Sequence, residues 1–316
     1  MKRVSLGRTG LAIHPLVFGS LPLGPLQANL SVAAGARIIR TALESGVNLI
    51  DTAALYQTYP YLRTALEGFA GTVHLASKTH ASDGMTARQH VEAALRALGR
   101  EQLDIVHLHG ARLVDPFVER AEVFDTLRQM QQEGKIAHLG LSTHYIVGVE
   151  KAAAEPDIAV IHPLINRNGM GILDGSARQM ATAIAAAAAA GKGVYAMKAL
   201  AGGNLISDAR ASLDYVRQLP GVQALAVGML SEDEVLANIA LFEEDPVDDQ
   251  VWTQLQSRQR RLQIMEQFCK GCGQCLTACT NQALALKNGV AQVEEEKCIL
   301  CGYCAVACPE FLIRVV

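Results

Sequence analysis

The positions of the cysteines constrain this chain more than any other feature of its sequence. The chain has eight cysteines, and none of them lies in the first 268 residues. They form two groups with the same spacing, C-x2-C-x2-C-x3-C, and each member of the second group follows its counterpart by 29 residues, as 298 follows 269. The tail is therefore an internal duplication of one small structural unit.

This spacing is typical of ligands to iron–sulfur clusters. Three thiolates on one tight loop can reach three corners of a cubane cluster, while the fourth, on the following helix, points to the other cluster. Two zinc sites would use CxxC pairs separated by a long loop, and disulfides fit neither the duplication nor a reducing cytosol. The sequence predicts two [4Fe–4S] clusters with crossed ligands: Cys269, Cys272, Cys275 and Cys308 for the first, and Cys298, Cys301, Cys304 and Cys279 for the second.

From about residue 265 to residue 316 the chain resembles a bacterial two-cluster ferredoxin, which implies a small α+β ferredoxin-like domain. The first cysteine group ends in Cys279-Thr280, where that family usually has Cys-Pro, whereas the second keeps Cys308-Pro309. Proline is not a ligand, so both clusters are still expected. The Asn-Gly pair at 288–289, between apolar flanks, predicts a small hairpin between the two halves.

The first 240 residues alternate between short β-like runs and helical patterns. The strands are expected at 15–19, 47–51, 73–77, 103–109, 136–142, 158–162, 193–197 and 224–228. Eight such units with right-handed crossovers predict a closed (β/α)8 TIM barrel, which typically needs about 250 residues. A doubly wound sheet is the competing topology, but GSLPLG at 19–24 lacks its glycine-rich fingerprint.

In such a barrel the chemistry belongs at the carboxyl ends of the strands. Several ionisable groups are expected to converge there, and Tyr56 follows one of them, Asp51, by five residues. The strand ends carry Gly19, Asp51, Ser77 with Lys78, His109, Ser142, His162, Met197 with Lys198, and Gly228. A lone histidine or lysine is usually a surface or satisfied side chain, but this convergence makes a candidate site.

The same region resembles the aldo-keto reductases in the order and spacing of its motifs, from about residue 4 to residue 240. The matching segments are LGRTGL at 6–11, GVNLIDTAALY at 46–56, SKT at 77–79, LDIVHLHG at 103–110 and GKIAHLGLSTH at 134–144. The resemblance implies a catalytic tetrad of Asp51, Tyr56, Lys78 and His109.

Carbonyl reduction requires a hydride for carbon and a proton for oxygen. We expect the Lys78 ammonium to favour the phenolate of Tyr56 and so to lower its pKa, and Asp51 to hold Lys78 in place. His109 would orient the carbonyl oxygen or share the proton. His107 lies two residues earlier on the same strand, one layer deeper, and is interpreted as structural.

By resemblance, a nicotinamide dinucleotide would lie across the barrel mouth. Its expected contacts are Gly19, Ser142, Thr143, Met197, Lys198, Gly228 and Asn238. NADPH-preferring members carry a Lys-Ser pair and an Arg for the 2′-phosphate, where this chain has Gly228, Met229 and Glu234. A carboxylate would repel a phosphate, so NADH is favoured over NADPH, or nucleotide binding is weak.

The domains are expected at 1–245 for the barrel, 246–264 for a connecting helix and 265–316 for the ferredoxin. The helical pattern at 250–267 contains Trp252 and an apolar stripe of Leu255, Leu262 and Met265. The helix is therefore expected to pack, and the ferredoxin to fold over or beside the barrel mouth. The alternative is a tethered domain that touches nothing catalytic.

Composition and charge limit the classes of partner that this chain is expected to bind. The net charge is −3 with a pI near 6.3, so nothing indicates nucleic acid. The longest apolar stretch, at 183–190, is too short to span a bilayer, and no secretory signal is evident. We expect a cytoplasmic protein that binds no membrane and acts on a small-molecule carbonyl, with an external one-electron carrier as a further partner.

Three functions remain open. The first is nicotinamide-dependent reduction of an aldehyde or ketone, or the reverse alcohol oxidation, coupled to electron transfer through the two clusters. The second is a nicotinamide-independent reductase that takes single electrons from the clusters. The third is a non-catalytic redox sensor or electron carrier, which would have no need of the tetrad.

Overall fold

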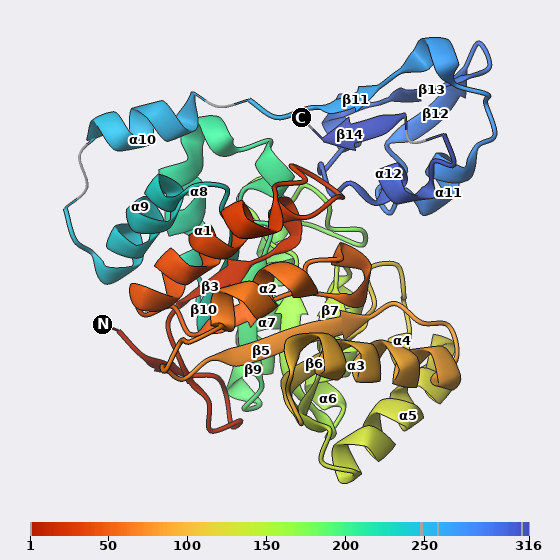
Figure 1. Ribbon diagram of the computed structural model, residues 1–316. Coiled ribbons are helices and arrows are strands. Elements are labelled where there is room, and N and C mark those ends of the chain that lie inside the picture. The colour runs from red at the N-terminus through yellow and green to blue at the C-terminus, as the bar shows by residue number, and fades with distance from the viewer. Residues whose placement is uncertain (1, 247–248, 258, 311, 316) are drawn as a thin grey trace.

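Eight parallel strands close into a barrel in the computed structural model, which describes residues 2–246, 249–257, 259–310 and 312–315 (Figure 1). Around the barrel the order is β10, β3, β4, β5, β6, β7, β8, β9, so the last strand pairs with the first. The strands are β3 Leu16–Gly19, β4 Leu49–Asp51, β5 His74–Thr79, β6 Leu103–His109, β7 Ile136–Thr143, β8 Ile158–Pro163, β9 Gly193–Met197 and β10 Ala224–Gly228. The predicted (β/α)8 barrel is confirmed, and the doubly wound sheet is excluded by this closure.

Helices surround the barrel and begin where the sequence supplies a capping side chain. Ser31, Asp83, Ser176 and Ser231 each accept a hydrogen bond from the first turn of the helix that follows, which satisfies an otherwise unpaired amide. The helices are α1 Val32–Glu44, α2 Tyr59–Leu66, α3 Gly84–Leu98, α4 Pro116–Glu119, α5 Ala121–Gln132, α6 Ile146–Ala154, α7 Ala177–Ala189, α8 Ala209–Arg217 and α9 Glu232–Glu243.

A short hairpin precedes the barrel and was not expected from the sequence. Its strands are β1 Val4–Ser5 and β2 Ala12–Ile13, which pair antiparallel. Leu6 and Ile13 are fully buried and pack against the barrel interior, where they join Tyr195 of β9. The hairpin thus contributes to the barrel core at the end away from the carboxyl ends of the strands.

The C-terminal domain is small and repeats one unit. The short helices α11 Gln274–Ala278 and α12 Tyr303–Ala307 pack together, and each follows a cysteine-rich loop. The strands β12 Leu284–Lys287 and β13 Val290–Val293 form the hairpin predicted from the Asn-Gly pair. Asn288 and Gly289 both have positive φ, 53° and 79°, as the tight turn requires.

The connecting segment differs from the expected helix. The helix is confined to α10 Asp249–Gln256, and β11 Leu262–Ile264 pairs with the C-terminal strand β14 Ile313–Val315. Leu262 therefore packs in the core of the small domain, whereas Leu255 and Trp252 pack against the barrel. On this pairing we propose that the C-terminal domain begins at β11.

The C-terminal domain lies against the carboxyl end of the barrel, as Figure 1 shows. Asn204 donates a hydrogen bond to the carbonyl of Cys298, and Gln27 donates one to the carbonyl of Leu300. Arg112 donates to two carbonyls on the other side of the domain, those of Thr277 and Cys279. The domain therefore has polar contacts with the barrel on both of its halves, and it is not a loose tether.

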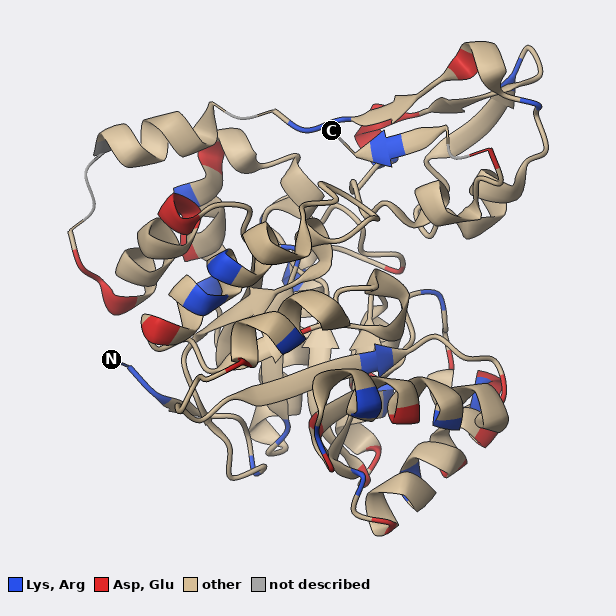
Figure 2. Ribbon diagram, viewed as in Figure 1, with Lys and Arg blue, Asp and Glu red and all other residues tan. Residues whose placement is uncertain are grey.

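Charged residues of both signs alternate over the outer helices α3, α4 and α5, as Figure 2 shows. Many of them form ion pairs, such as Arg88 with Glu133 and Lys151 with Asp115. In the part of the chain that the structure describes, no helix is both long enough and apolar enough to cross a bilayer.

Gly302 provides a test of the contact between the C-terminal domain and the barrel, because its backbone packs closely against Leu26 of the barrel. A Cβ at this position would lie 2.3 Å from the carbonyl oxygen of Leu26, while one at the equivalent Gly273 of the first repeat would meet nothing within 4 Å. Both residues have positive φ, 79° and 75°, so alanine strains both backbones equally, by about 1–2 kcal/mol. We expect Gly302→Ala, but not Gly273→Ala, to speed tryptic cleavage between the two domains of the anaerobically purified protein. Equal cleavage rates in the two variants would contradict the docking.

Candidate active site at the barrel mouth

Lys78 and Asp51 form a buried ion pair at the carboxyl ends of two neighbouring strands. Lys78 Nζ donates to Asp51 Oδ1 at 2.5 Å and to the backbone carbonyl of Thr52 at 2.9 Å. The Lys78 side chain is 2% exposed, so its charge has lost almost all of its hydration. Burial lowers the pKa of Lys78, and the Asp51 carboxylate opposes this shift. The ion pair is what makes a buried ammonium tolerable here.

Tyr56 ends the short 3-10 helix η2 Ala54–Tyr56, and its ring faces the same ammonium. Lys78 Nζ lies 4.9 Å from the centroid of the Tyr56 ring. Burial raises the pKa of Tyr56 well above its usual value, and the neighbouring Tyr303 and Asp51 raise it further. The expectation that Lys78 would lower this pKa is therefore wrong, because desolvation dominates. Tyr56 is a neutral phenol, a proton donor rather than a phenolate.

Tyr195 on β9 forms a hydrogen bond with the second carboxylate oxygen of Asp51. The sequence did not predict this role for Tyr195. Its hydroxyl donates to Asp51 Oδ2 at 2.8 Å and lies 2.6 Å from His107 Nε2. Tyr195 is fully buried in the barrel interior. His107 thus supports Asp51 through Tyr195, which agrees with its interpretation as a structural residue. Only the closure of the barrel brings β9 to β4 and β6, so no local pattern indicates this contact.

His109 ends β6 in register with Ser142 of β7, which in turn pairs with His162 of β8. His162 Nδ1 lies 2.7 Å from the carbonyl oxygen of Tyr195. Burial lowers the pKa of both His109 and His162 well below the usual value, and the Lys78 ammonium lowers them further. Both rings are therefore neutral near pH 7, so each can donate one hydrogen bond and accept another.

Tyr303, from α12 of the C-terminal domain, enters this group. Its hydroxyl lies 3.1 Å from His109 Nε2, and the two rings meet edge to face with their centroids 6.0 Å apart. It also packs with Tyr56 and Leu26. Tyr303 lies between two cluster cysteines in the sequence, where nothing distinguishes it from a helix residue, so its position was not predicted.

A cavity of about 530 Å³ opens beside the four tetrad residues. Such a volume is typical of small-molecule and cofactor sites. Asp51 and Tyr56 line it, while Lys78 lies behind Asp51 and His109 lies beside Tyr303. Of the expected cofactor contacts, the cavity wall contains Gly19, Met197, Lys198, Gly228 and Asn238.

Ser142 and Thr143 are not part of this wall. Thr143 Oγ1 accepts a hydrogen bond from the backbone amide of Tyr145 at 3.0 Å, so it stabilises the turn before α6. Ser142 Oγ is buried without a hydrogen-bond partner among the described residues. A contact of Ser142 with a carboxamide remains a proposal, and the local bond of Thr143 does not favour one for that residue.

Three polar atoms of cavity residues have no protein partner within the described part of the chain. They are Lys198 Nζ, Asn238 Oδ1 and Trp252 Nε1, all shielded from solvent. A buried polar atom without a partner costs about 1–3 kcal/mol, which a ligand can recover by bonding to it. Lys198 also has a positive φ of 61°, a strained conformation of the kind that gathers at functional sites. Two donors and one acceptor without partners fit a polar ligand.

Three residues occupy the positions where the sequence analysis expected contacts to a 2′-phosphate: Gly228, Met229 and Glu234. Met229 is fully buried, and Glu234 accepts a hydrogen bond from the backbone amide of Leu230 at 2.6 Å. Gly228 has the ring of Pro22 so close that a Cβ would lie 2.3 Å from it. These three residues supply no cation for a phosphate.

The cysteines gather around two smaller hollows in the C-terminal domain. One is lined by Cys269, Cys272, Cys275 and Cys308, and the other by Cys279, Cys298, Cys301 and Cys304. These are the two crossed sets expected from the sequence, and all eight thiols are free. Amides of Ala291, Leu312 and Ala283 donate to sulfur atoms of three of the cysteines, as thiolate ligands require. The donor sets therefore fit two iron–sulfur clusters.

The two hollows differ in their surroundings. Cys301 also lines the large cavity, and Ile299 beside it packs with Met197 and Leu164 of the barrel. In the other hollow Cys272 is exposed to solvent. The second cysteine set thus faces the candidate active site, and the first set faces outward.

The fold and these residues define an oxidoreductase barrel joined to an iron–sulfur domain, and comparison with known proteins names both parts. Residues 15–212 match the model of the aldo/keto reductase family, and residues 261–309 match a 4Fe-4S dicluster domain. The chain belongs to the aldo/keto reductase family.

Curated relatives match part of the chain. The chain is 29% identical over 217 residues to aflatoxin B1 aldehyde reductase member 2 of Rattus norvegicus. This matched region covers 62% of this chain and 55% of the relative. It is 26% identical over 157 residues to L-galactose dehydrogenase of Arabidopsis thaliana, covering 44% and 47%. The chain thus spans about half the length of these relatives, so their activities are not transferred to it.

Solved structures cover more of the chain. A protein from Pseudomonas aeruginosa described as an aldo-keto reductase is 28% identical, with a TM-score of 0.66 over 77% of this chain and 94% of its own. An aldo-keto reductase from Bacillus halodurans shares the fold at 23% identity, with a TM-score of 0.64 over 81% and 95%.

The buried histidines predict the direction of the acid response. Burial lowers the pKa of His107, His109, His144 and His162 well below the usual value. In the unfolded chain they titrate near pH 6.5, so from about that pH downward the unfolded state binds more protons than the folded state. We expect a lower thermal unfolding midpoint, by circular dichroism, at about pH 5.5 than at about pH 7.5. Visible cluster absorbance, followed in parallel, distinguishes barrel unfolding from cluster loss. An unchanged or higher midpoint would contradict the neutral state of these rings.

Proposed function

We propose that the protein catalyses nicotinamide-dependent reduction of an aldehyde or ketone, or the reverse oxidation, and exchanges electrons between this site and two [4Fe–4S] clusters. One observation carries the proposal: a single cavity has Tyr56 and Asp51, Asn238 and Cys301 in its wall. A candidate proton donor, a candidate nucleotide contact and a candidate cluster ligand therefore line the same cavity.

The residues of the tetrad would supply the proton that the substrate oxygen needs and stabilise the charge that this leaves. Tyr56, kept neutral by burial, would donate its proton to the oxygen of the substrate. The Lys78 ammonium beneath the ring would stabilise the negative charge left on the phenolate oxygen of Tyr56, and Asp51, fixed by Tyr195, would hold the ammonium in place. His109 would orient the carbonyl by a hydrogen bond. A bound nicotinamide would supply the hydride.

The C-terminal domain supports an electron path between the site and the exterior. Bound clusters would supply or accept single electrons. Cys301 lies in the cavity wall and Cys272 lies at the surface, so the two cysteine sets connect the cavity with a position accessible to an external one-electron carrier. We propose a reducing, cytoplasmic setting, in which such free thiols are ordinarily found.

We propose NADH rather than NADPH as the preferred nucleotide. The support is the pair Met229 and Glu234 at the positions where a 2′-phosphate would need a hydroxyl and a guanidinium. A carboxylate close to a phosphate dianion is unfavourable, whereas NADH has no phosphate there.

A second function has one observation in its favour. Cys301 and Tyr56 line the same cavity, so single electrons could reach a substrate at Tyr56 without a nicotinamide. In that case the tetrad would still supply protons, and nucleotide binding would be dispensable.

An anaerobic titration with NADH and with NADPH distinguishes the two functions. Under the proposed function NADH binds, its fluorescence changes, and it bleaches the visible absorbance of the clusters. Because a hydride carries two electrons and each cluster accepts one, complete bleaching should consume one NADH per protein. Absence of binding at millimolar concentrations of either nucleotide, with carbonyl reduction by chemically reduced protein intact, would favour the nicotinamide-independent reductase.

Tyr56→Phe tests the proton donor. We expect it to lower kcat for carbonyl reduction by about 100-fold or more, because general acid catalysis contributes about 10²–10⁴. Tyr59→Phe is the matched control, since Tyr59 is a nearby half-buried phenol whose hydroxyl pairs with Ser77. Equal rates of carbonyl reduction in wild type and Tyr56→Phe would contradict Tyr56 as the proton donor, whereas no carbonyl reduction by either, with cluster reduction intact, would indicate an electron carrier.

Tyr303→Phe tests access to the site. The Tyr303 hydroxyl occupies a hydrogen-bonding position on His109 that a substrate oxygen needs. We expect Tyr303→Phe to lower KM for the carbonyl substrate while kcat changes little, because the competing hydroxyl is gone. A higher KM would mean instead that Tyr303 binds the substrate.

A further inference from the structure

The segment that joins the two domains forms part of the large cavity. Trp252 and Leu255 come from α10, and Gln259 and Arg260 follow before β11 begins. Trp252 is 4% exposed, yet its Nε1 donor has no partner among the described residues. Sequence patterns assign this segment no chemistry, because a connecting helix is expected to do no more than pack.

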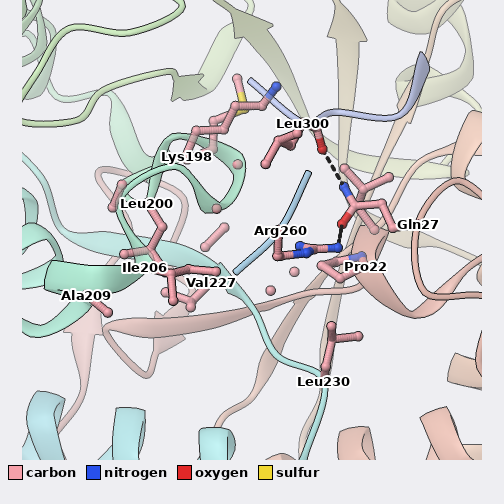
Figure 3. Close-up of a pocket in the computed structure, with 18 of the residues that line it drawn as sticks. Pro22, Gln27, Lys198, Leu200, Ile206, Ala209, Val227, Leu230, Arg260 and Leu300 are labelled. Atoms are coloured by element: carbon pink, nitrogen blue, oxygen red, sulfur yellow. Dashed lines mark hydrogen bonds between the residues drawn. The ribbon is translucent and has the colours of Figure 1, made fainter. Parts of the chain in front are cut away.

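Arg260 crosses between two loops of the barrel. Its Nη2 donates to Gln27 Oε1 at 2.8 Å, and Gln27 belongs to the loop between β3 and α1. Its aliphatic stem lies on Gly203, in the loop between β9 and α8, where a Cβ would come within 3.1 Å of Arg260 Cδ. Gln27 in turn donates to the carbonyl of Leu300 at 3.2 Å. Figure 3 shows these bonds and places Arg260 between Lys198 at one end and Leu230 at the other.

Arg260 is a cation without a carboxylate partner. Among the described residues it forms no ion pair, and its hydrogen bond goes to the neutral amide of Gln27. Burial lowers its pKa and the nearby Glu234 carboxylate opposes this shift, but a guanidinium keeps its proton at any physiological pH. The charge has therefore lost hydration, and the Glu234 carboxylate is near it but forms no ion pair with it among the described residues, an arrangement that favours an anionic ligand in the cavity.

We infer that Arg260 binds the diphosphate of a nucleotide in this cavity, so that the interdomain segment supplies the phosphate contact that β10 and α9 lack. The inference rests on the proposed function for the identity of the nucleotide. A guanidinium presents parallel donors that match two phosphate oxygens. In Figure 3 Arg260 lies between Lys198, a candidate nicotinamide contact, and Leu230, which shortly precedes α9 with the candidate adenine contact Asn238, so its charge faces the middle of a dinucleotide.

The position of Arg260 favours the diphosphate over a 2′-phosphate. A 2′-phosphate would lie at the Gly228–Leu230 end, where Glu234 accepts the amide of Leu230. Arg260 instead contacts Gln27 and Gly203, on the two loops that face each other across the cavity. The contact should therefore serve NADH and NADPH equally, and ADP as well, since all three share the diphosphate.

Binding measurements on the anaerobically purified, cluster-loaded full chain test the inference without an activity assay. Dissociation constants for NADH, NADPH and ADP are measured by calorimetry for wild type, Arg260→Gln and Arg260→Lys. We expect Arg260→Gln to weaken all three by about 10- to 100-fold, the range for a charged hydrogen bond. Arg260→Lys should restore part of the loss, because the ammonium keeps the charge but not the paired donors.

Arg261→Gln is the matched control. Arg261 is the next residue, carries the same charge and is exposed to solvent, so its loss alters the net charge equally without touching the cavity. The control should bind all three nucleotides as the wild type does. Unchanged cluster absorbance in each variant shows that the domains are folded.

The outcomes separate this inference from the proposed function. If wild type and Arg260→Gln bind the nucleotides equally, or if the substitution weakens NADPH alone, the diphosphate contact is wrong while the proposed function stands. If the wild type binds neither NADH nor NADPH, the proposed function fails. In that case, ADP binding that Arg260→Gln weakens would still support the diphosphate contact, and its absence would overturn that as well.

Discussion

The buried ion pair between Lys78 and Asp51 is the constraint on which the rest of the site depends. Removing two charges from water costs several kcal/mol per ion, and the attraction between them offsets this only when further hydrogen bonds complete both groups. Here the carbonyl of Thr52 completes the ammonium and the hydroxyl of Tyr195 completes the carboxylate. The pair therefore requires three strands in register, and a closed barrel provides that register.

Much of this arrangement was accessible from the sequence. The strand ends could be predicted because alternating and helical apolar patterns repeat eight times, and each strand end sets a side chain at one rim. The cysteine spacing likewise indicated two ligand sets, and the hollows in the C-terminal domain collect the same residues. In both cases the signal is local, since a few neighbouring residues carry it.

The remaining features depend on contacts between distant segments. Tyr195 reaches Asp51 across the barrel, Tyr303 reaches His109 from another domain, and Arg260 reaches Gln27 from a connecting segment. The direction of the Tyr56 pKa was wrong for a related reason. The expected place of Lys78 beside Tyr56 in the tetrad suggested a Coulomb effect, but burial outweighs that effect, and burial is a property of the folded molecule.

The loop that holds Ile299, Leu300 and Cys301 has one more consequence. It forms part of the wall of the barrel cavity, and its Cys301 also lines the hollow that would hold the second cluster. If a cluster binds there, we expect this wall to take its final shape only when iron and sulfide are inserted. A chain without them would then have a more open cavity that binds its ligands less tightly.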